Sequence, residues 1–355
     1  MVEHVVVIGA GVYGAAVAAS LGRRGARVTV VDGGAPAGGT SGATFSWINS
    51  CGKQPRGYHD LNVAGMEAHR RLAAEVPDGD WYHETGNLEW ADTEREELRR
   101  KVSGLDDYGY ETRWLSREEA LRLEPGLDPA VLPDEVAFFP QEGWLDPGRM
   151  VNYLLSRGAE LVSDDAVTAF ELDGVVRAVR LASGRRLPAD AVVNCAGPAA
   201  GRVAKLAGLH LPMRNTTGVL VHTGPVASRV SRVVHAPQVH LRPNGGSRVL
   251  LHSADTDGQP ADQTTADTVL TAGRALYPGI RDAAVESVRL GERPIPGDGL
   301  PVLGRVRELP NFHFAVSHSG ATLCLHAGDL VAAEVLGADQ DGTLAGFRFE
   351  RFSGQ

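Results

Sequence analysis

The chain has 355 residues, with 35 Lys and Arg, 44 Asp and Glu, and a formal net charge of −9. This length predicts two or three domains of roughly 100–200 residues each. A content of 43% hydrophobic and 22% charged residues excludes an intrinsically disordered chain. The acidic balance argues against a nucleic-acid partner, and the absence of about 18 consecutive apolar residues argues against a membrane span. An N-terminus without signal-peptide features predicts a cytoplasmic protein.

The first 32 residues predict a βαβ unit that binds a dinucleotide. An apolar run over residues 4–8 is typical of a buried parallel strand, residues 15–21 are expected to form a helix, and residues 27–31 a second strand. Between the first strand and the helix lies the sequence Gly9-Ala10-Gly11-Val12-Tyr13-Gly14.

Each glycine of this motif has a separate task in binding a pyrophosphate. Gly9 permits the tight turn, Gly11 lets the backbone approach the phosphates, and Gly14 lets helix and strand pack closely. Free N–H groups at the helix start, around Val12 and Tyr13, stabilise the phosphate charge. A glycine-rich turn without a ligand is the alternative, but the complete strand–turn–helix–strand context favours a dinucleotide.

Asp32 and the loop after it discriminate between dinucleotides. A carboxylate at the end of the second strand can accept hydrogen bonds from ribose hydroxyls, which favours FAD or NAD over NADP. Residues 33–44 are small and hydroxylic, with Thr40, Ser41 and Thr44 among them, and form no third regular strand. Taken alone, this segment is equally compatible with a flexible loop.

Cysteine and histidine patterns give no indication of a metal site. Cys51, Cys195 and Cys324 lie far apart without a CxxC pair, and the 12 histidines form no HExxH or comparable motif. We therefore expect neither a disulfide framework nor a metal ion.

Four segments, in family order, resemble the D-amino-acid oxidase superfamily of FAD enzymes, which includes glycine oxidase, sarcosine oxidase and D-amino-acid dehydrogenase. They are the loop at residues 33–44, the GWLDP sequence at 143–147, the CAGP turn at 195–198 after a strand, and the C-terminal pair 293–301 and 317–323. The resemblance spans nearly the whole chain and implies FAD as the cofactor.

The resemblance also implies which residues hold FAD. Hydroxyl groups of the loop contact the phosphates or the isoalloxazine, a hairpin lies beside the adenine, and a backbone turn approaches the cofactor. A segment ahead of a helix at about residues 327–336 lies near the pyrimidine edge of the flavin, where reduction builds negative charge. The residues implied in these roles are Thr40, Ser41, Thr44, Val167, Cys195, Ala196, Gly197, Ser319, Gly320, Ala321 and Thr322.

The cofactor segments are discontinuous, which predicts an α/β fold of two interleaved domains. Residues 1–84, 143–212 and 290–355 are expected to form a Rossmann-like FAD-binding domain with a parallel sheet. Residues 85–142 and 213–289 are expected to form an α+β substrate-binding domain with a mainly antiparallel sheet, because short alternating runs and a Pro-Asn-Gly-Gly turn at 243–246 favour hairpins. The charge-rich segment 92–102 is expected to be a solvated helix.

Members of this superfamily oxidise C–N bonds, so the implied reaction converts an amino acid or a carboxylate-bearing secondary amine to an imine by hydride transfer to flavin. A carboxylate substrate needs a fixed cation, best supplied by an arginine. Arg293, five residues before Asp298, matches in spacing the carboxylate-binding arginine of glycine oxidase and D-amino-acid dehydrogenase. A structural arginine tied to Glu292 or to a backbone carbonyl is the alternative.

Three further residues are candidates for catalysis. His318 precedes the Gly320 turn and could steer protons, unless it is a buried imidazole satisfied by the backbone. His240 shares one face of a strand with Arg242, and either could line the pocket or lie at the surface. Lys53 is the lysine best placed to promote the reaction with oxygen, as a lysine does in sarcosine oxidase, with an exposed lysine as the alternative.

Three differences from sarcosine oxidase bear on the expected substrate and on how the flavin is attached. Phe45 stands where that enzyme has a carboxylate-binding arginine, Thr322 where it has a lysine, and Leu290 near the cysteine that tethers its flavin. These differences argue against sarcosine as the substrate and for a non-covalent FAD.

Other functions stay open at this point. The same fold could oxidise a 2-hydroxy acid or a biosynthetic intermediate, or the chain could be a non-catalytic flavin-binding subunit of an amine dehydrogenase complex. An NAD-dependent dehydrogenase is disfavoured by the later flavin segments. The partners expected are a small-molecule amine or amino acid, and oxygen or an electron carrier as acceptor; the oligomeric state is left open.

Overall fold

A six-stranded sheet forms around β1 (His4–Ile8), which is buried along its whole length. The computed structural model describes residues 2–227 and 229–353. Val5 and Val7 face one hydrophobic core and Val6 and Ile8 another, so the strand must be apolar on both sides. The strand order is β19-β20-β13-β1-β2-β9, parallel except for the edge pair β19 and β20. The other five strands are β2 (Arg27–Val31), β9 (Glu160–Val162), β13 (Ala191–Asn194), β19 (Val302–Arg305) and β20 (Phe312–Val316).

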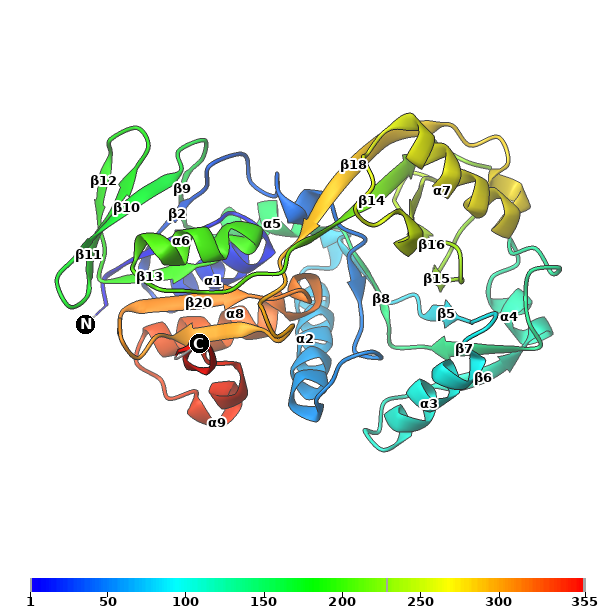
Figure 1. Cartoon of the computed structure of the whole chain (residues 1–355), viewed down its shortest axis with the longest axis horizontal. Coiled ribbons are helices and arrows are strands. Elements are labelled where there is room, and N and C mark those ends of the chain that lie inside the picture. The colour runs from blue at the N-terminus through cyan, green and yellow to red at the C-terminus, as the bar shows by residue number, and fades with distance from the viewer. Residues whose placement is uncertain (1, 228, 354–355) are drawn as a thin grey trace.

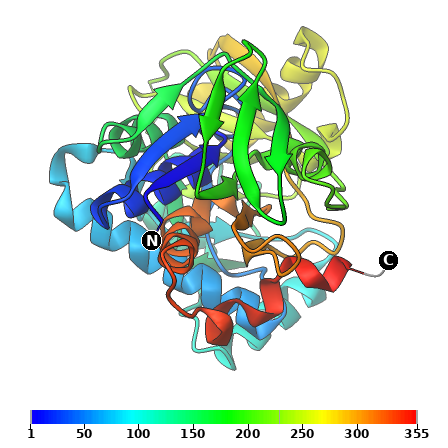
Figure 2. The same ribbon diagram turned by 90° about the vertical axis from the view of Figure 1, so that its left-hand side faces the viewer.

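Helices cover one face of this sheet, and a small second sheet with one helix covers the other (Figure 1). The first group is α1 (Val12–Arg23), α2 (Arg56–Glu75), α5 (Pro147–Leu155) and α8 (Gly320–Val335). The second is the antiparallel sheet β10 (Val167–Leu172), β11 (Val176–Leu181) and β12 (Arg186–Pro188), with α6 (Ala200–Leu206). Figure 2, which faces this end of the molecule, shows β10–β12 in front.

α8 begins earlier than expected, and it packs closely against α1. We predicted a helix from about residue 327, but α8 begins at Gly320. A Cβ on Gly328 would lie 3.0 Å from the Cβ of Ala16, so the two helices can approach only because small residues meet at their crossing. The glycine that suggested a turn is therefore the first residue of a buried helix.

An eight-stranded sheet fills the other half of the molecule (Figure 1). Its order is β18-β14-β17-β16-β15-β5-β7-β6, antiparallel except between β15 and β5. The helices on this half are α3 (Arg95–Asp106), α4 (Arg117–Leu123) and α7 (Gln263–Leu276). The strands are β5 (Asn87–Glu89), β6 (Arg113–Ser116), β7 (Glu135–Phe139), β14 (Thr216–Thr223), β15 (Val233–His235), β16 (His240–Pro243), β17 (Val249–His252) and β18 (Val285–Arg293).

Alternation along these strands separates a core face from an open face. Leu241 and Leu251 are cross-strand partners in the core that α7 covers, together with Val219. The intervening residues, such as His240 and His252, point to the opposite face. This opposite face can therefore serve as the wall of a site.

A third, three-stranded sheet connects the two halves. It consists of β3 (Trp47–Ile48), β8 (Gly143–Leu145) and β4 (Tyr82–His83), with β8 in the middle. Trp47 of β3 and Trp144 of β8 are cross-strand partners in this sheet. Because β3 lies within the first 50 residues, this sheet places the N-terminal part of the chain beside the half of the molecule that contains the eight-stranded sheet.

The predicted fold class is confirmed: a parallel Rossmann-like sheet is combined with a mainly antiparallel one. The turn at 243–246 joins β16 to β17 as a hairpin. The division at 85–142 and 213–289 stays a prediction, and β18 runs across the proposed boundary at 290.

The helix expected to be solvated is in fact partly buried. α3 presents Leu98, Val102 and Leu105 to the interior, and Lys101 points the same way. Its Nζ lies 2.7 Å from Oε2 of Glu89, and its side chain is only 25% exposed. Placing Lys101 on a solvated face was wrong, because a charge-rich segment with apolar residues at helical spacing still has an inward side.

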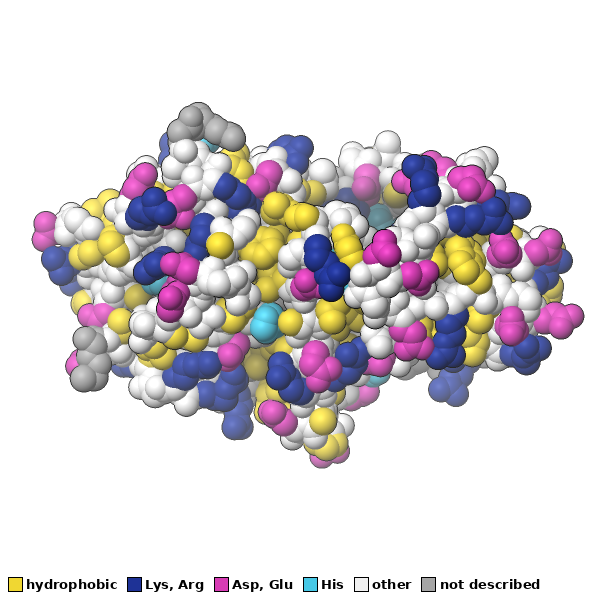
Figure 3. Space-filling model, turned by 90° about the horizontal axis from the view of Figure 1, so that it is seen from below, with side chains coloured by type: hydrophobic (Ala, Val, Ile, Leu, Met, Phe, Trp, Pro, Cys, Tyr) yellow, Lys and Arg dark blue, Asp and Glu magenta, His cyan; other side chains and the backbone are white. Residues whose placement is uncertain are grey.

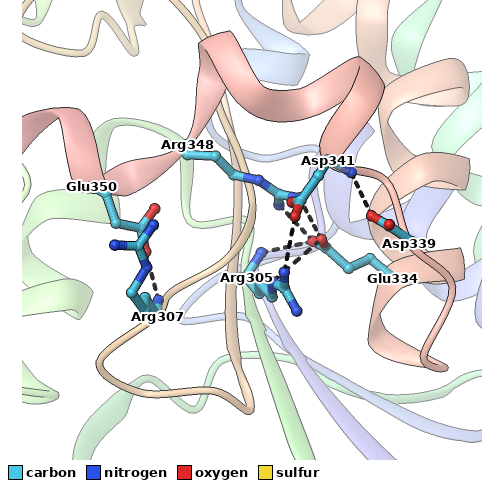
Figure 4. A network of polar contacts seen from close by, with 7 residues as sticks. All are labelled: Arg305, Arg307, Glu334, Asp339, Asp341, Arg348 and Glu350. Carbon is cyan, nitrogen blue, oxygen red and sulfur yellow. Dashed lines mark hydrogen bonds and ion pairs between the residues drawn. The ribbon is translucent and has the colours of Figure 1, made fainter.

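The C-terminal segment is held to the first half by a buried ion-pair network (Figure 4). Glu334, near the end of α8, accepts hydrogen bonds from Arg348 at 2.6 and 2.8 Å and from the backbone N–H of Arg305 at 2.8 Å. Arg348 also bonds Asp341, which begins the short helix α9 (Asp341–Leu344). Since the Glu334 side chain is 4% exposed, these contacts replace its lost hydration.

Charges of both signs alternate over the face shown in Figure 3, so the described residues of this face form no continuous basic surface. Within residues 2–227 and 229–353, no helix combines the length and apolarity that crossing a bilayer requires.

Candidate active site

A cavity of about 680 Å³ lies at the carboxyl ends of β1, β2 and β13. In an open parallel sheet, this edge is where dinucleotides bind. The residues predicted to hold a cofactor that line it are Gly9, Gly11, Val12, Tyr13, Asp32, Thr40, Ser41, Thr44, Val167, Cys195, Ala196, Gly197, Gly320 and Ala321. Segments far apart in the sequence thus meet around one space.

The glycines of the first turn are required by close backbone approaches. Gly9 has φ of +107°, and a Cβ there would overlap the carbonyl of Cys195. A Cβ on Gly14 would overlap the carbonyl oxygen of Gly9, so Gly14 lies under the turn rather than in the cavity wall. Gly11 leaves space beside Ser41, whose Oγ accepts the Val12 N–H at 3.1 Å.

Asp32 is held in place by two backbone donors. Its Oδ2 accepts the N–H of Ala10 at 2.6 Å, and its Oδ1 accepts the N–H of Gly34 at 2.9 Å. Each carboxylate oxygen retains a second lone pair for a hydroxyl in the cavity. This is the arrangement that ribose recognition needs.

A second cavity of about 490 Å³ adjoins the first. It lies between the open face of the eight-stranded sheet and the first half of the molecule. The residues that line both cavities are Thr40, Thr44, Pro294, His318 and Ala321. Of the predicted cofactor residues, Ser319 and Thr322 line only the second cavity.

Arg293 lines the second cavity, but its guanidinium is already paired. Nη1 and Nη2 donate to the two carboxylate oxygens of Asp257 at 2.8 and 2.9 Å. Nη2 also donates to Nε2 of His252 at 3.1 Å. The alternative of a structural arginine named Glu292 or a backbone carbonyl as its partner. The main partner is instead Asp257, a residue that the sequence did not single out.

Three histidines form a cluster that begins beside Arg293 at His252, because the sheet register makes them neighbours. His235 is the cross-strand partner of His240, which is the partner of His252. Burial lowers the pKa of all three, that of His240 to about 3. The ring of Phe45 lies among them, with its centroid 5.7 Å from that of His235. The cluster is therefore uncharged at neutral pH.

Of the two residues predicted to share a strand face, only His240 lines the cavity. Arg242 is buried behind Phe45, where its Nε donates to the Phe45 carbonyl at 2.5 Å and its guanidinium lies 4.7 Å from the Trp144 ring centroid. Burial lowers the pKa of Arg242 to about 9.

His318 and Lys53 lie together in the second cavity. The surrounding protein, Lys53 and Arg293 lower the pKa of His318 to about 4, so it is neutral at physiological pH. Burial also lowers the pKa of Lys53. The predicted catalytic residues Arg293, His318, Lys53 and His240 are thus brought together, while their roles stay predictions.

Beneath this cavity lies a buried carboxylate that the sequence did not suggest. Glu142 accepts hydrogen bonds from Tyr110 at 2.8 Å, from Trp47 at 2.9 Å and from Asn87 at 3.1 Å. Burial raises its pKa to about 7, and the positive charge of Lys101 opposes that shift. Its three hydrogen-bond partners come from three separate segments, so no local pattern could have found this cluster.

Comparison with known proteins identifies the family. Residues 4–334 match the family model described as FAD dependent oxidoreductase.

The chain belongs to this FAD-dependent oxidoreductase family. It is 27% identical over 372 residues to a glycine oxidase of Geobacillus kaustophilus, covering 99% of this chain and 97% of that protein. A glycine oxidase of Bacillus licheniformis is 23% identical over 350 residues, covering 94% and 92%.

Solved structures of family members have the same architecture. The crystal structure of glycine oxidase from Geobacillus kaustophilus matches with a TM-score of 0.89 at 25% identity, over 99% of this chain and 100% of that one. Iminodiacetate oxidase from Chelativorans matches with a TM-score of 0.82 at 26% identity, over 97% and 98%.

The geometry of the first cavity fits the FAD of this family. Its walls combine the glycine turn, the start of α1 and the Asp32 carboxylate, which suit a pyrophosphate and a ribose. Val167 of β10 lines this cavity but not the second one, whereas Ala321, at the start of α8, lines both. An elongated dinucleotide with its reactive ring toward the second cavity matches this order of residues.

Sequence reasoning missed His235, His252, Asp257 and Glu142. Alternation on the strands at 239–242 and 248–252 was a usable signal for His252. The remaining three depend on strand register and on contacts between distant segments, which a single sequence does not reveal.

Proposed function

We propose that this enzyme oxidises the C–N bond of an amino acid or of a carboxylate-bearing secondary amine to an imine. The observation that carries the proposal is a small cavity, adjoining the FAD cavity, that contains the guanidinium of Arg293, the ammonium of Lys53 and a cluster of neutral histidines. Bound FAD would accept the hydride equivalent from the carbon that carries the nitrogen. Water then hydrolyses the imine.

The residues of the second cavity supply binding and orientation. A substrate carboxylate would bind Arg293, either by replacing Asp257 or by bridging beside it. Neutral His240 and His235 offer lone pairs to an amine, and Phe45 excludes water from one side. His318 lies where the two cavities meet, so it is placed to contact both the substrate and the flavin.

The names of the relatives described above support an amine as donor. Glycine oxidases and iminodiacetate oxidase both act, by their names, on amines that carry a carboxylate. We propose no particular amino acid. Lys53 is the candidate for promoting reaction with oxygen, if oxygen is the acceptor.

The test is anaerobic reduction of the bound flavin, followed by its absorption spectrum. A panel of glycine, D- and L-amino acids, N-methyl amino acids and iminodiacetate is compared with the 2-hydroxy acids of matching side chain. Bleaching by an amine but not by its hydroxy counterpart is expected. Bleaching by hydroxy acids alone would contradict the proposal, and a flavin that no compound reduces would favour a non-catalytic subunit.

The cofactor linkage is tested on the same sample. Acid precipitation should release the flavin absorption into the supernatant, because Leu290 offers no thiol for a covalent link. Absorption that stays with the pellet would contradict a non-covalent FAD.

A further inference from the structure

The wall of the second cavity is tied to Glu142 by a short chain of hydrogen bonds. Asn87 Nδ2 lies 3.1 Å from Glu142 Oε2, and Asn87 Oδ1 lies 2.8 Å from Nδ1 of His235. Trp47 Nε1 lies 2.9 Å from the same Oε2. Both Trp47 and His235 line the cavity, and their ring centroids are 3.9 Å apart.

Chemistry fixes the direction of each bond in this chain. An indole N–H can only donate, so Glu142 Oε2 is an acceptor toward Trp47. While Glu142 is ionised, both of its oxygens can only accept, so the nitrogen of Asn87 faces Glu142. Its amide oxygen then faces His235 and can only accept. His235 Nδ1 therefore carries the hydrogen.

A neutral His235 with its hydrogen on Nδ1 has a lone pair on Nε2. That nitrogen has no hydrogen-bond partner among the residues that the structure describes, although His235 lines the cavity. His252 differs: its Nε2 already accepts from Arg293 at 3.1 Å and its Nδ1 faces the carbonyl of Val219 at 3.1 Å. The acceptor of His252 is used within the protein, whereas that of His235 is left for a ligand.

We propose that His235 Nε2 accepts a hydrogen bond from an N–H group of the substrate, and that Asn87 and Glu142 are positioning residues that hold His235 in this tautomer. The nature of the donor rests on the proposed function. With a cation for the carboxylate and an acceptor for the nitrogen among its lining residues, the cavity selects ligands in which both groups lie on one small molecule.

Two substitutions of His235 distinguish the acceptor that it offers to a ligand from its hydrogen bond to Asn87. Asn places an amide near the position of Nδ1, so His235→Asn can keep the bond to Asn87 while losing the group at Nε2. Gln reaches further, so His235→Gln can restore an acceptor there.

The probes are two ligands that cannot be oxidised as amines: pyrrole-2-carboxylate, which has a ring N–H, and 2-furoate, which has a ring oxygen. Their Kd values on the holoenzyme are measured by calorimetry. The wild type is expected to prefer pyrrole-2-carboxylate by roughly tenfold, the effect of one hydrogen bond. The preference should vanish in His235→Asn and return in part in His235→Gln. A preference that persists in His235→Asn would overturn the proposal.

The positioning role has its own readout. Nitrogen-15 NMR of histidine-labelled holoenzyme distinguishes a ring nitrogen that carries hydrogen from one that does not. At a pH well above 7, where Glu142 is ionised, His235 in the wild type should show hydrogen on Nδ1, and Asn87→Leu should move part of it to Nε2 while the His252 signals stay unchanged. Hydrogen on Nε2 in the wild type would overturn the proposal.

These measurements need no turnover. A flavin that no amine reduces would refute the proposed function, yet the ligand preference and the tautomer would still decide the role of His235. If Asn87→Leu fails to fold, the wild-type tautomer and the two His235 variants decide it alone.

Discussion

At the scale of single residues, the site combines charges that are already neutralised with groups left open to a ligand. Asp257 neutralises Arg293 before any substrate arrives, while three histidines are kept uncharged by burial. The charges of Arg293 and Asp257 therefore cancel, which leaves the ammonium of Lys53 among the charged groups that line the cavity. Recognition of a substrate that carries both charges depends on where each polar group points more than on attraction from a distance.

The first prediction concerns the pair Arg293 and Asp257. Arg293→Ala should lower kcat/KM for a carboxylate substrate, because the ligand loses its partner in a partly buried site. The expected loss of transition-state stabilisation is about 2–4 kcal/mol. Asp257→Asn is the matched control: it leaves the guanidinium in place and releases it from its ion pair, so KM should stay unchanged or fall. Steady-state kinetics of both variants would decide the role, and equal losses in both would identify the pair as structural.

Glu142 should make stability depend on pH. Burial raises its pKa in the folded state from 4.5 to about 7, so between these values the folded protein binds more protons than the unfolded chain. Stability should therefore fall as pH rises through this window, by about 3 kcal/mol from this group. Glu142→Gln removes the titration and can keep the bonds to Trp47 and Asn87. Urea unfolding from pH 5 to 8 measures the difference, and parallel curves for variant and wild type would refute it.

At the scale of elements, the βαβ unit could be predicted in detail because each of its contacts is local. β1, α1 and β2 lie within a few residues of their expected bounds, and the glycines of the turn have the close approaches assigned to them. The early start of α8 and the inward side of α3 could not be predicted. Both depend on which helix or sheet packs against them, and Gly328 and Lys101 show this partner only in the folded chain.

Two glycines of α1 provide a paired test of this packing. Gly14→Ala would force a Cβ into the carbonyl of Gly9, so it should cost more than about 2 kcal/mol of stability and weaken FAD binding. In Gly22→Ala the new Cβ would lie 3.7 Å from the carbonyl oxygen of Arg157, an ordinary contact. This substitution should therefore stabilise the helix by up to about 1 kcal/mol. Chemical unfolding and FAD titration check both variants. Equal effects would show that the turn is less tightly packed than described.

At the scale of the whole molecule, the site is assembled from segments that no single pattern links. Trp47 lies in the three-stranded sheet, Asn87 and His235 lie in the eight-stranded sheet, and Glu142 lies in the turn between β7 and β8. The cofactor cavity was predictable because its residues stand in motifs. The second cavity was predictable where a residue stood next to such a motif, as Arg293 and His318 do, or on an alternating strand, as His240 does.

The C-terminal network should contribute to global stability. Arg348→Ala would leave Glu334 buried with a weaker partner, Arg305 at 3.9 Å, and should cost about 3–5 kcal/mol. Arg99→Ala, which breaks exposed pairs with Glu96 and Glu135, should cost less than about 1 kcal/mol. Thermal unfolding compares the two, and the double variant Arg348→Ala, Glu334→Gln should recover part of the loss.

β18 belongs to the antiparallel sheet, yet its last residues also touch the loop that borders the FAD cavity. Arg289 donates to the carbonyl of Gly42 at 2.8 Å, Thr40 donates to the carbonyl of Glu292 at 2.6 Å, and Gly291 leaves no space for a side chain against Ala43. The conformation of β18 is therefore coupled to the order of the loop at residues 40–43. Loss of FAD should loosen not only the glycine turn but also the β14–β18 ribbon, and with it the position of Arg293. Hydrogen exchange of the apoprotein and the holoenzyme should then differ in β18, although none of its residues lines the first cavity. An empty first cavity should also lower the affinity of the second cavity for its ligand.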